Sequence, residues 1–262
     1  MFTHHFQRLF FVCTSIVALT IVTSCNPDED ETGTPGGSGN TTVPSGETSE
    51  WLNPDLTYGS VTDQDGNTYA TIEIGTQEWM AENLRTTTYA NGDPIPNVTG
   101  QSQWSYLTTG AWAHYNNDSQ YEIPYGKLYN WYTVADPRNI CPTGWHVPTD
   151  AEWTVLTDYL GGLEVAGGKM KTTGTREDLT GLWYSPNDEA TNSSGFSGAP
   201  GGFRYNDGVY LFTIGYDGVW WSSSDVNTDF AWYRGLNYFD SFVTRSSYGV
   251  KGDGMSVRCV RD

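Results

Sequence analysis

The sequence has few basic residues. Lys and Arg together number 13 against 31 Asp and Glu, which gives a formal net charge of −18. A protein that binds DNA or RNA needs cations to neutralise phosphates, so we expect no nucleic-acid partner. An acidic surface is compatible with solubility, with bound cations or with neutral sugars as ligands.

Catalytic signatures are also missing. The sequence contains no GxSxG nucleophile turn, no HExxH zinc motif and no phosphate-binding loop. Its 4 His include only two beyond the N-terminal segment, His114 and His146. For His146 we expect packing or local hydrogen bonds. No nucleophile–base set emerges, and we expect that the protein is not an enzyme.

The first 24 residues resemble a bacterial lipoprotein signal peptide. Met1–Arg8 is weakly basic, Leu9–Val22 is apolar, and the segment ends in Val-Thr-Ser-Cys, which resembles a lipobox. The resemblance implies cleavage before Cys25 and lipidation of that cysteine, which makes the membrane a partner. The alternative is a short transmembrane helix, for which the apolar stretch is too short to span a bilayer comfortably.

A tether is expected over residues 25–56. It begins with an acidic run, residues 26–31, that resembles the surface-export signal of Bacteroidetes lipoproteins. This resemblance implies an outer-membrane lipoprotein exposed at the cell surface, and the alternative is a solvated linker. The following Gly, Ser, Thr and Pro residues cannot bury a core. The folded domain is therefore expected over residues 57–262.

Two of the 4 cysteines belong to the folded domain. Cys13 leaves with the signal peptide and Cys25 takes the lipid, so Cys141 and Cys259 remain. An even pair outside the cytoplasm favours a disulfide. Two buried free thiols are the alternative.

The clearest local prediction is a helix that begins after Thr149. Thr149 and Glu152 have the spacing of a capping box, and Gly161 follows as a stop signal. The residues at i, i+3 and i+7 form one apolar face: Trp153, Leu156 and Leu160. Asp150 and Glu152 also resemble an acid/base pair, but capping accounts for both.

The rest of the domain is predicted to be mostly strands and turns. A hairpin is expected over residues 58–75 around the Asp65-Gly66 turn. Its DxDGN string also suggests a calcium loop, but glycine and glutamate are not at the EF-hand positions. We expect another helix to open over residues 125–132, a long irregular segment over 164–197, and four or five antiparallel strands from residue 198 onward.

Aromatic residues interleaved with polar ones between residues 104 and 123 suggest a sugar-binding platform. Rings can stack on sugar C–H faces while amides and carboxylates bond hydroxyls. The candidate residues are Trp104, Trp112, Tyr115, Asn116 and Asp118. Ordinary packing of an aromatic-rich loop is the alternative.

A series of ordered motifs resembles the Fibrobacter succinogenes major paralogous domain, over about residues 57–262. The motifs are DQDGNTY, EWMAENLR, YGKLYNWY, CPTGWHVPTDAEW, SPNDEATNSSGF, GGFRY, WWSSS and SVRCVRD. This family is common in lipoproteins of Fibrobacter and Bacteroidetes and is largely uncharacterised in function.

VPTDAEW and SVRCVRD are also similar to segments of formylglycine-generating-enzyme-like domains. That likeness implies an α+β, C-type-lectin-like fold, with two helices packed on a twisted antiparallel sheet and long loop regions. The copper-binding cysteine pair of those enzymes has no counterpart here, so we expect fold similarity without that activity.

Calcium-dependent lectins suggest one further candidate site. Their Glu-Pro-Asn loop corresponds to Ser-Pro-Asn at residues 185–187, and only Asn187, Asp188, Glu189 and Asp225 remain as possible Ca²⁺ ligands. We therefore expect no cofactor, and bound Ca²⁺ is the alternative. The expected function is a lipid-anchored binding or adhesion module for a glycan or a surface protein. An envelope enzyme acting on polysaccharide and a purely structural protein are the alternatives.

Overall fold

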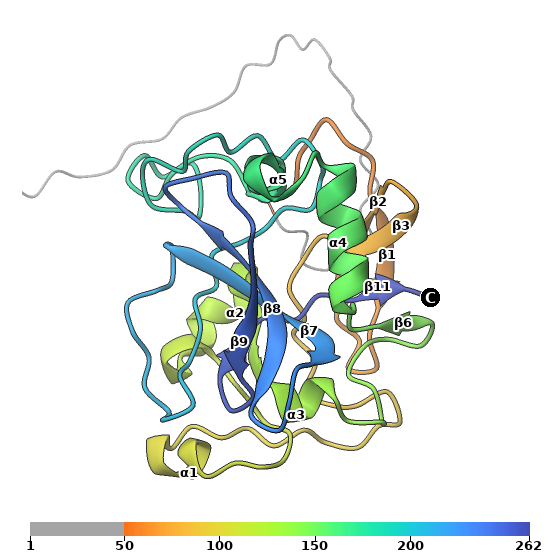
Figure 1. Ribbon diagram of the computed structural model, residues 1–262, viewed down its shortest axis with the longest axis vertical. Helices are drawn as coiled ribbons and strands as arrows, with labels where there is room; N and C mark the ends of the chain where they lie inside the picture. Colours follow the sequence, from red (N-terminus) through yellow and green to blue (C-terminus); the bar gives the residue numbers. More distant parts are fainter. Residues whose placement is uncertain (1–49) are drawn as a thin grey trace, which may run out of the picture. The chain divides into compact units, whose positions relative to one another are not determined.

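The computed structural model describes residues 50–262, which contain three antiparallel sheets and five short α-helices (Figure 1). The first sheet has the strand order β1-β2-β3-β11-β6, formed by β1 (Gly59–Thr62), β2 (Thr68–Ile74), β3 (Gln77–Met80), β6 (Trp145–His146) and β11 (Val260–Arg261). The second has the order β10-β5-β4, formed by β4 (Trp112–Ala113), β5 (Leu128–Asn130) and β10 (Gly254–Met255). The third has the order β7-β8-β9, formed by β7 (Asp217–Asp225), β8 (Phe230–Asn237) and β9 (Thr244–Val250).

The helices are α1 (Gln101–Ser105), α2 (Glu122–Tyr125), α3 (Trp131–Val134), α4 (Asp150–Tyr159) and α5 (Leu163–Met170). Two 3₁₀ turns, Tyr115–Asn117 and Ser119–Tyr121, precede α2. Within residues 50–262, no helix is long and apolar enough to cross a membrane. The α+β class predicted from the sequence is confirmed.

The β1–β2 hairpin turns at Asp65-Gly66 as predicted. Gly66 has φ +86°, a conformation that glycine adopts readily. Both oxygens of Asp63 are used inside the hairpin, since Oδ1 accepts from the amides of Asp65 and Asn67 at 2.9 Å and Oδ2 accepts from the Tyr69 hydroxyl at 2.7 Å. The DxDGN string therefore stabilises a turn.

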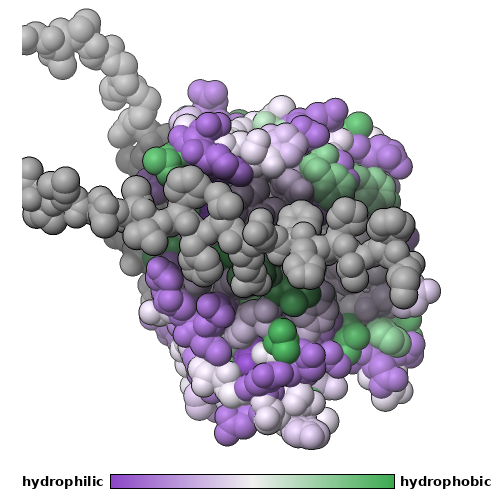
Figure 2. All heavy atoms as spheres, turned by 90° about the vertical axis from the view of Figure 1, so that its left-hand side faces the viewer, coloured by the Kyte–Doolittle hydropathy of each residue, from purple (hydrophilic) through white to green (hydrophobic). Residues whose placement is uncertain are grey.

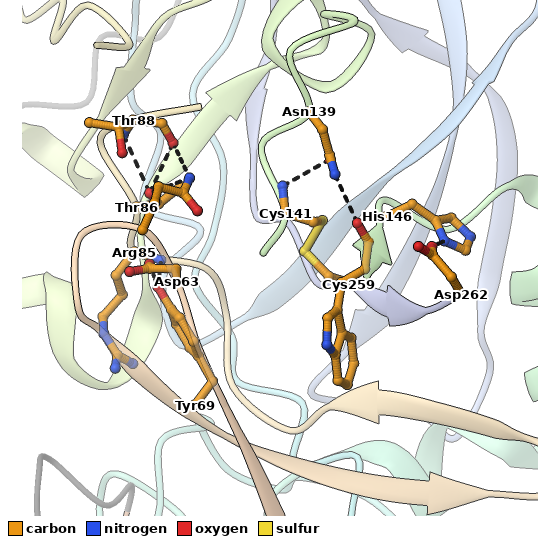
Figure 3. The surroundings of a disulfide bond; sticks show 12 residues. Asp63, Tyr69, Arg85, Thr86, Thr88, Asn139, Cys141, His146, Cys259 and Asp262 are labelled. Atoms are coloured by element: carbon orange, nitrogen blue, oxygen red, sulfur yellow. Dashed lines mark hydrogen bonds and ion pairs between the residues drawn. A yellow bond between two sulfur atoms is a disulfide. The ribbon is translucent and has the colours of Figure 1, made fainter. Parts of the chain in front are cut away.

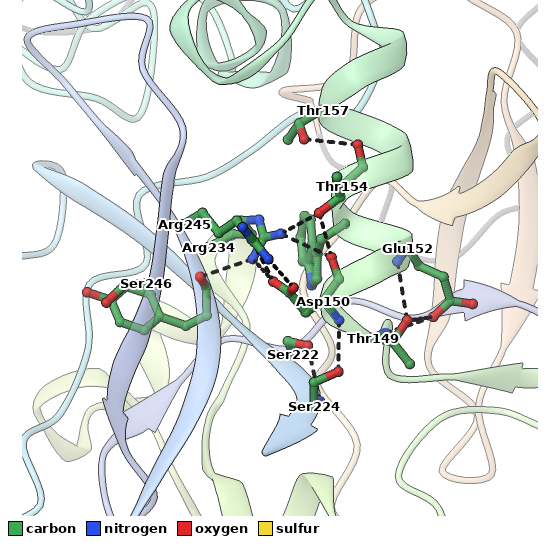
Figure 4. A network of polar contacts seen from close by, with 12 residues as sticks. Thr149, Asp150, Glu152, Thr154, Thr157, Ser222, Ser224, Arg234, Arg245 and Ser246 are labelled. Atoms are coloured by element: carbon green, nitrogen blue, oxygen red, sulfur yellow. Dashed lines mark hydrogen bonds and ion pairs between the residues drawn. The ribbon is translucent and has the colours of Figure 1, made fainter. Parts of the chain in front are cut away.

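The predicted capping box of α4 is confirmed. The Thr149 hydroxyl accepts from the Glu152 amide, and Glu152 Oε2 accepts from the Thr149 amide at 2.7 Å (Figure 4). The apolar face of α4 enters the core, where the rings of Trp79 and Trp153 lie 4.7 Å apart. Figure 1 shows α4 between the β7–β9 sheet and the strands β1–β3.

The β7–β9 sheet separates two hydrophobic cores. Because side chains alternate along a strand, Trp221 and Ala231 face the first core, while Trp220 and Leu236 face the second core together with α4 and α5. Both faces of this sheet are therefore covered over much of their area. An open end of the first core remains, and it forms the candidate site.

The disulfide between Cys141 and Cys259 is formed, with a Cα–Cα distance of 6.0 Å (Figure 3). It ties the segment before β6 to the segment before β11, and both cysteines are buried in the first core. The predicted pairing is thus confirmed.

Two secondary-structure predictions were wrong. Residues 125–132 do not open as a helix, because Leu128–Asn130 pairs as strand β5 and only one helical turn begins at Trp131. The irregular segment predicted over 164–197 contains most of α5. Its Gly167 and Gly168 disfavour a helix locally, but a Cβ at either position would lie within 2.6 Å of the backbone of Ser241 or Glu189. Tertiary packing therefore overrides propensity.

The remaining strand prediction was partly right. β7, β8 and β9 lie in the region predicted to hold four or five antiparallel strands, whereas residues 201–212 form only isolated bridges around Arg204. At the other end, Leu52 and Leu56 pack against the second core. Ordered packing thus begins within the segment predicted as tether.

Candidate functional site

A cavity of about 240 Å³ lies where the first core reaches the surface beside the β7–β9 sheet. Its wall combines residues of β7, β8, β9 and β10 with two loop segments. The lining residues are Phe203, Tyr205, Val219, Tyr233, Tyr248, Gly249, Asp253 and Met255. Four rings and one carboxyl group therefore surround the cavity.

The aromatic wall is held by packing beneath it. Phe203 and Tyr233 are partly buried against the first core, and the ring of Tyr205 meets that of Phe203 edge-on at 4.8 Å. A Cβ on Gly249 would lie 2.6 Å from the Trp221 ring and 3.0 Å from the Tyr233 ring. Glycine at position 249 thus lets the two strands keep these rings close.

Tyr248 is the most exposed ring of the cavity, with 76% of its surface accessible. A β-bulge explains its position: Ala231 pairs with Gly249 and Tyr233 pairs with Ser246, so β9 has one more residue than β8 between the two pairs. Bulges of this kind redirect side chains beside binding sites. Tyr248 therefore stands at the mouth of the cavity.

Asp253 supplies the only charge in the lining, and it is 7% exposed. Its Oδ1 accepts from the Asn206 amide at 2.7 Å. No ion pair to Asp253 occurs among residues 50–262. Burial raises the pKa of this carboxyl to about 6, although the amides of Asn206 and Val250 act in the opposite direction.

The turn that carries Asp253 is fixed from below by Arg204. The backbones of Arg204 and Gly254 exchange hydrogen bonds of 2.8 and 2.7 Å. The guanidinium of Arg204 is fully buried between the rings of Trp104 and Tyr210, at 4.3 and 4.8 Å, and donates to carbonyl oxygens of Val98, Thr99 and Gly208. This support places the carboxyl in a defined position.

The aromatic residues predicted as a sugar platform are largely buried. Trp104, Trp112 and Tyr115 are 1%, 8% and 6% exposed. The indole of Trp104 donates to the Gly252 carbonyl and that of Trp112 to the Ile95 carbonyl, both at 2.9 Å. Because the protein covers these rings, they form no exposed stacking surface in this structure. Trp104 instead supports the turn that carries Asp253.

Asn116 and Asp118 lie in the 3₁₀ turns. Asn116 is exposed and adopts φ +53°, while Asp118 accepts from the Gln120 amide at 3.0 Å. Neither residue lines the cavity beside the β7–β9 sheet. The five residues therefore do not converge on one surface.

Two of the candidate calcium ligands, Asn187 and Asp188, lie in a segment beside Lys171. The ammonium of Lys171 donates to the carbonyls of Asp188 and Asp240 at 2.7 Å and to that of Asn237 at 3.1 Å. Asn187 is buried and its amide donates to the carbonyls of Thr172 and Gly174 at 2.9 Å. A positive charge of the protein itself thus binds the carbonyl cluster.

The acidic side chains among the candidate calcium ligands lie at the surface. Asp188, Glu189 and Asp225 are exposed, and Asp225 Oδ2 lies 3.8 Å from the Lys251 ammonium. In the described part of the chain, no three His, Cys, Asp or Glu side chains are grouped so that they could hold a metal ion.

The charged residues of α4 form structural contacts rather than an acid/base pair. Asp150 accepts from Arg234 at 2.8 Å and from Arg245 at 2.6 Å (Figure 4). Burial alone would raise the pKa of Asp150, but the two guanidinium groups hold it below its usual value. His146 lies between Asp262, at 2.6 Å (Figure 3), and Glu152, at 2.8 Å, so the prediction of local bonding is confirmed.

Sequence reasoning did not find the cavity. Phe203, Tyr205, Tyr233 and Tyr248 come from three separate segments, and Asp253 stands in a Gly-Asp-Gly turn. The one available signal was an acidic residue between glycines in a region of aromatic strands. On the visible part of the face in Figure 2, hydrophobic residues form separate patches in a mostly hydrophilic surface.

Comparisons with known proteins place the chain in a family. The family model of the Fibrobacter succinogenes major domain matches residues 72–261, which include every strand of the three sheets except β1 and the first part of β2. Neither the curated proteins nor the solved structures gave a match. The resemblance seen in the sequence motifs is thereby confirmed, and the chain belongs to the Fibrobacter succinogenes major domain family.

Proposed function

We propose that this protein is a binding module of the bacterial envelope that takes its ligand in the aromatic cavity beside the β7–β9 sheet. The observation that carries the proposal is the combination of four rings, one of them largely exposed, with a buried carboxyl group that has no cationic partner among residues 50–262. Binding sites are typically concave and largely apolar, with a few placed polar groups. The ligand is a group on a glycan or on a surface protein.

The proposed setting follows from the N-terminal sequence, which lies outside the described residues. Lipidation of Cys25 anchors the protein in the outer membrane, and the acidic run directs it to the cell surface. The tether then holds the domain away from the lipid. We further propose that the domain is a variant of the C-type-lectin-like fold, in which α4 and α5 pack on the β7–β9 sheet.

The contacts of Lys171 with three carbonyl oxygens bear on the alternative that the protein binds calcium. In this proposal Lys171 replaces a metal ion, because its ammonium already binds three carbonyl oxygens of the loop. Binding is accordingly proposed to be independent of calcium.

An envelope enzyme is favoured by one observation, the raised pKa of Asp253, since a carboxyl with a pKa of about 6 can act as a general acid near neutral pH. Glycoside hydrolysis ordinarily requires a second carboxyl group. The other seven residues that line the cavity are not acidic. Binding without turnover is therefore the better-supported function.

The test is a glycan-array and peptide-array screen with the chain from residue 26 onward, which lacks only the signal and the lipid anchor. Tyr248→Ala should reduce binding at least tenfold, because the ring is part of the contact. Tyr106→Ala is the matched control, since Tyr106 is 86% exposed but directly follows α1, outside the cavity.

Each outcome bears on the proposal. Binding that is lost in Tyr248→Ala and unchanged by a chelator would support it. A ligand that binds the wild type and Tyr248→Ala equally would place the site elsewhere, and release of product from a bound glycan would favour the enzyme.

A further inference from the structure

We propose that the group bound in this cavity is an organic ammonium ion. This inference rests on the proposed function and names the ligand chemistry of the same site. It is argued from the charge balance of the cavity, the nature of its walls and its size.

The charge balance of the cavity favours a cationic ligand. Of the 13 Lys and Arg residues, only Arg8 lies outside the described region. The other 12 are held by carboxylates, carbonyl oxygens or rings. Lys251, two residues before Asp253, donates to the Asn227 carbonyl and lies 4.2 Å from the centre of the Trp131 ring. A buried carboxylate without a counter-ion is unfavourable, and a bound cation removes that penalty.

The walls are suited to a cation as well. The face of an aromatic ring attracts positive charge, and quaternary ammonium groups are recognised in cages of such rings. The same fold uses this interaction internally, where Arg204 lies over Trp104 and Tyr210. In the cavity, four rings and Asp253 line the same space.

A sugar is less well matched to the lining. Its hydroxyls require several polar partners, and the cavity offers one carboxyl and the hydroxyls of three tyrosines. The remaining lining residues, Phe203, Val219, Gly249 and Met255, offer no polar side chain. A volume of about 240 Å³ is also below the usual range of roughly 300–1,000 Å³ for ligand pockets. It suits one ammonium head group rather than an oligosaccharide.

The experiment compares choline with its neutral isostere 3,3-dimethylbutan-1-ol by isothermal titration calorimetry at pH 7.5. The protein is the chain from residue 26 onward. Nα-acetyl-lysine amide tests a primary ammonium, and glucose and N-acetylglucosamine test neutral sugars. We expect both cations to bind and the isostere to bind at least tenfold more weakly, because it lacks the charge. Asp253→Asn should lower choline affinity at least tenfold, whereas Tyr106→Ala should leave it unchanged.

A pH series supplies a second measurement that needs no variant. Choline does not titrate, so a change in affinity reports on the protein. Asp207 and Tyr205 are the titratable neighbours of Asp253 that interact with it electrostatically, and Tyr233 and Tyr248 complete the polar lining. Affinity should fall several-fold between pH 7.5 and pH 5, as the Asp253 carboxyl takes up a proton.

The outcomes separate the inference from the proposed function. Equal affinity for choline and its isostere, or a choline affinity that does not change with pH or in Asp253→Asn, would overturn the ammonium assignment. Binding of a neutral sugar alone, lost in Tyr248→Ala, would also overturn it while leaving the proposed function intact. If none of the array ligands or cations binds in a manner sensitive to Tyr248, both proposals fail.

Discussion

Replacement of Asp253 by Asn should make the protein more stable at pH 8 while it weakens the ligand site. The carboxyl is 7% exposed, and its pKa lies at about 6 instead of 3.8 because burial disfavours the charged form. One pKa unit corresponds to about 1.4 kcal/mol, so ionised Asp253 lowers the free energy of unfolding by up to roughly 3 kcal/mol. Asn carries no charge and keeps an oxygen that accepts from the Asn206 amide.

The pH dependence gives the sign of the effect. Because the pKa of Asp253 is higher in the folded than in the unfolded protein, folding is penalised fully above pH 6, and the penalty disappears as the pH falls toward 4. The stability gained by Asp253→Asn should therefore be largest above pH 6 and shrink toward zero near pH 4. Other carboxylates are common to both proteins and cancel in the difference.

The assay is urea unfolding of wild type and Asp253→Asn at pH 8, 6 and 4.5, followed by tryptophan fluorescence. Asp158→Asn is the control, because Asp158 is exposed on α4 and does not line the cavity, so its change should alter stability by less than about 0.5 kcal/mol. A variant that is less stable than wild type at pH 8, or a stability difference that does not vary with pH, would refute the reasoning.

Three further predictions concern the rest of the fold. Loss of the disulfide in Cys141→Ser/Cys259→Ser should lower the free energy of unfolding by about 5 kcal/mol, from a sequence separation of 118; an unchanged urea midpoint would contradict this. Lys171→Met leaves three carbonyl oxygens without their ammonium donor and should destabilise the protein by about 2–4 kcal/mol. Amide hydrogen exchange of residues 185–197 should accelerate in Lys171→Met but not in the control Lys169→Met. Equal exchange in both variants would show that the contacts of Lys171 do not hold this segment. Burial lowers the pKa of His146, but hydrogen bonds and charge interactions with Asp262 and Glu152 together raise it by more, so that the net shift is upward. Its stabilising contribution should be complete below about pH 6.5 and be lost as the pH rises through the raised pKa. The pKa of His146, measured by NMR titration of the imidazole, should be lower in Asp262→Asn than in the wild type. A wild-type pKa at or below 6.5 would show that the two carboxylates do not outweigh burial.

Local signals in the sequence predicted local structure well. The capping box at Thr149, the turn at Asp65-Gly66 and the strands from Asp217 onward depend on neighbouring residues, and the structure contains all of them. The disulfide could be paired because only two cysteines remained once the N-terminal segment was set aside. The family, too, could be recognised from short ordered motifs.

The candidate site could not be read in the same way, because its position depends on tertiary contacts. Trp104 and Trp112 are suitable stacking residues by type. Their hydrogen-bond partners, Gly252 and Ile95, are 148 and 17 residues away in the sequence, and contacts of this kind bury the rings. Tyr248 lies in a β-bulge of β9, which depends on how this strand pairs with β8. The α5 helix was missed for a related reason, since close packing rather than propensity accounts for Gly167 and Gly168.

The bulge in β9 has a consequence for neighbouring molecules. β9 is an edge strand of its sheet, and an edge strand exposes backbone groups onto which a second chain can add a strand. The extra residue between Ser246 and Gly249 interrupts the regular spacing of those groups. If the protein is anchored in a membrane beside other copies of itself, the bulge that lies next to Tyr248 also discourages aggregation of adjacent copies through this edge.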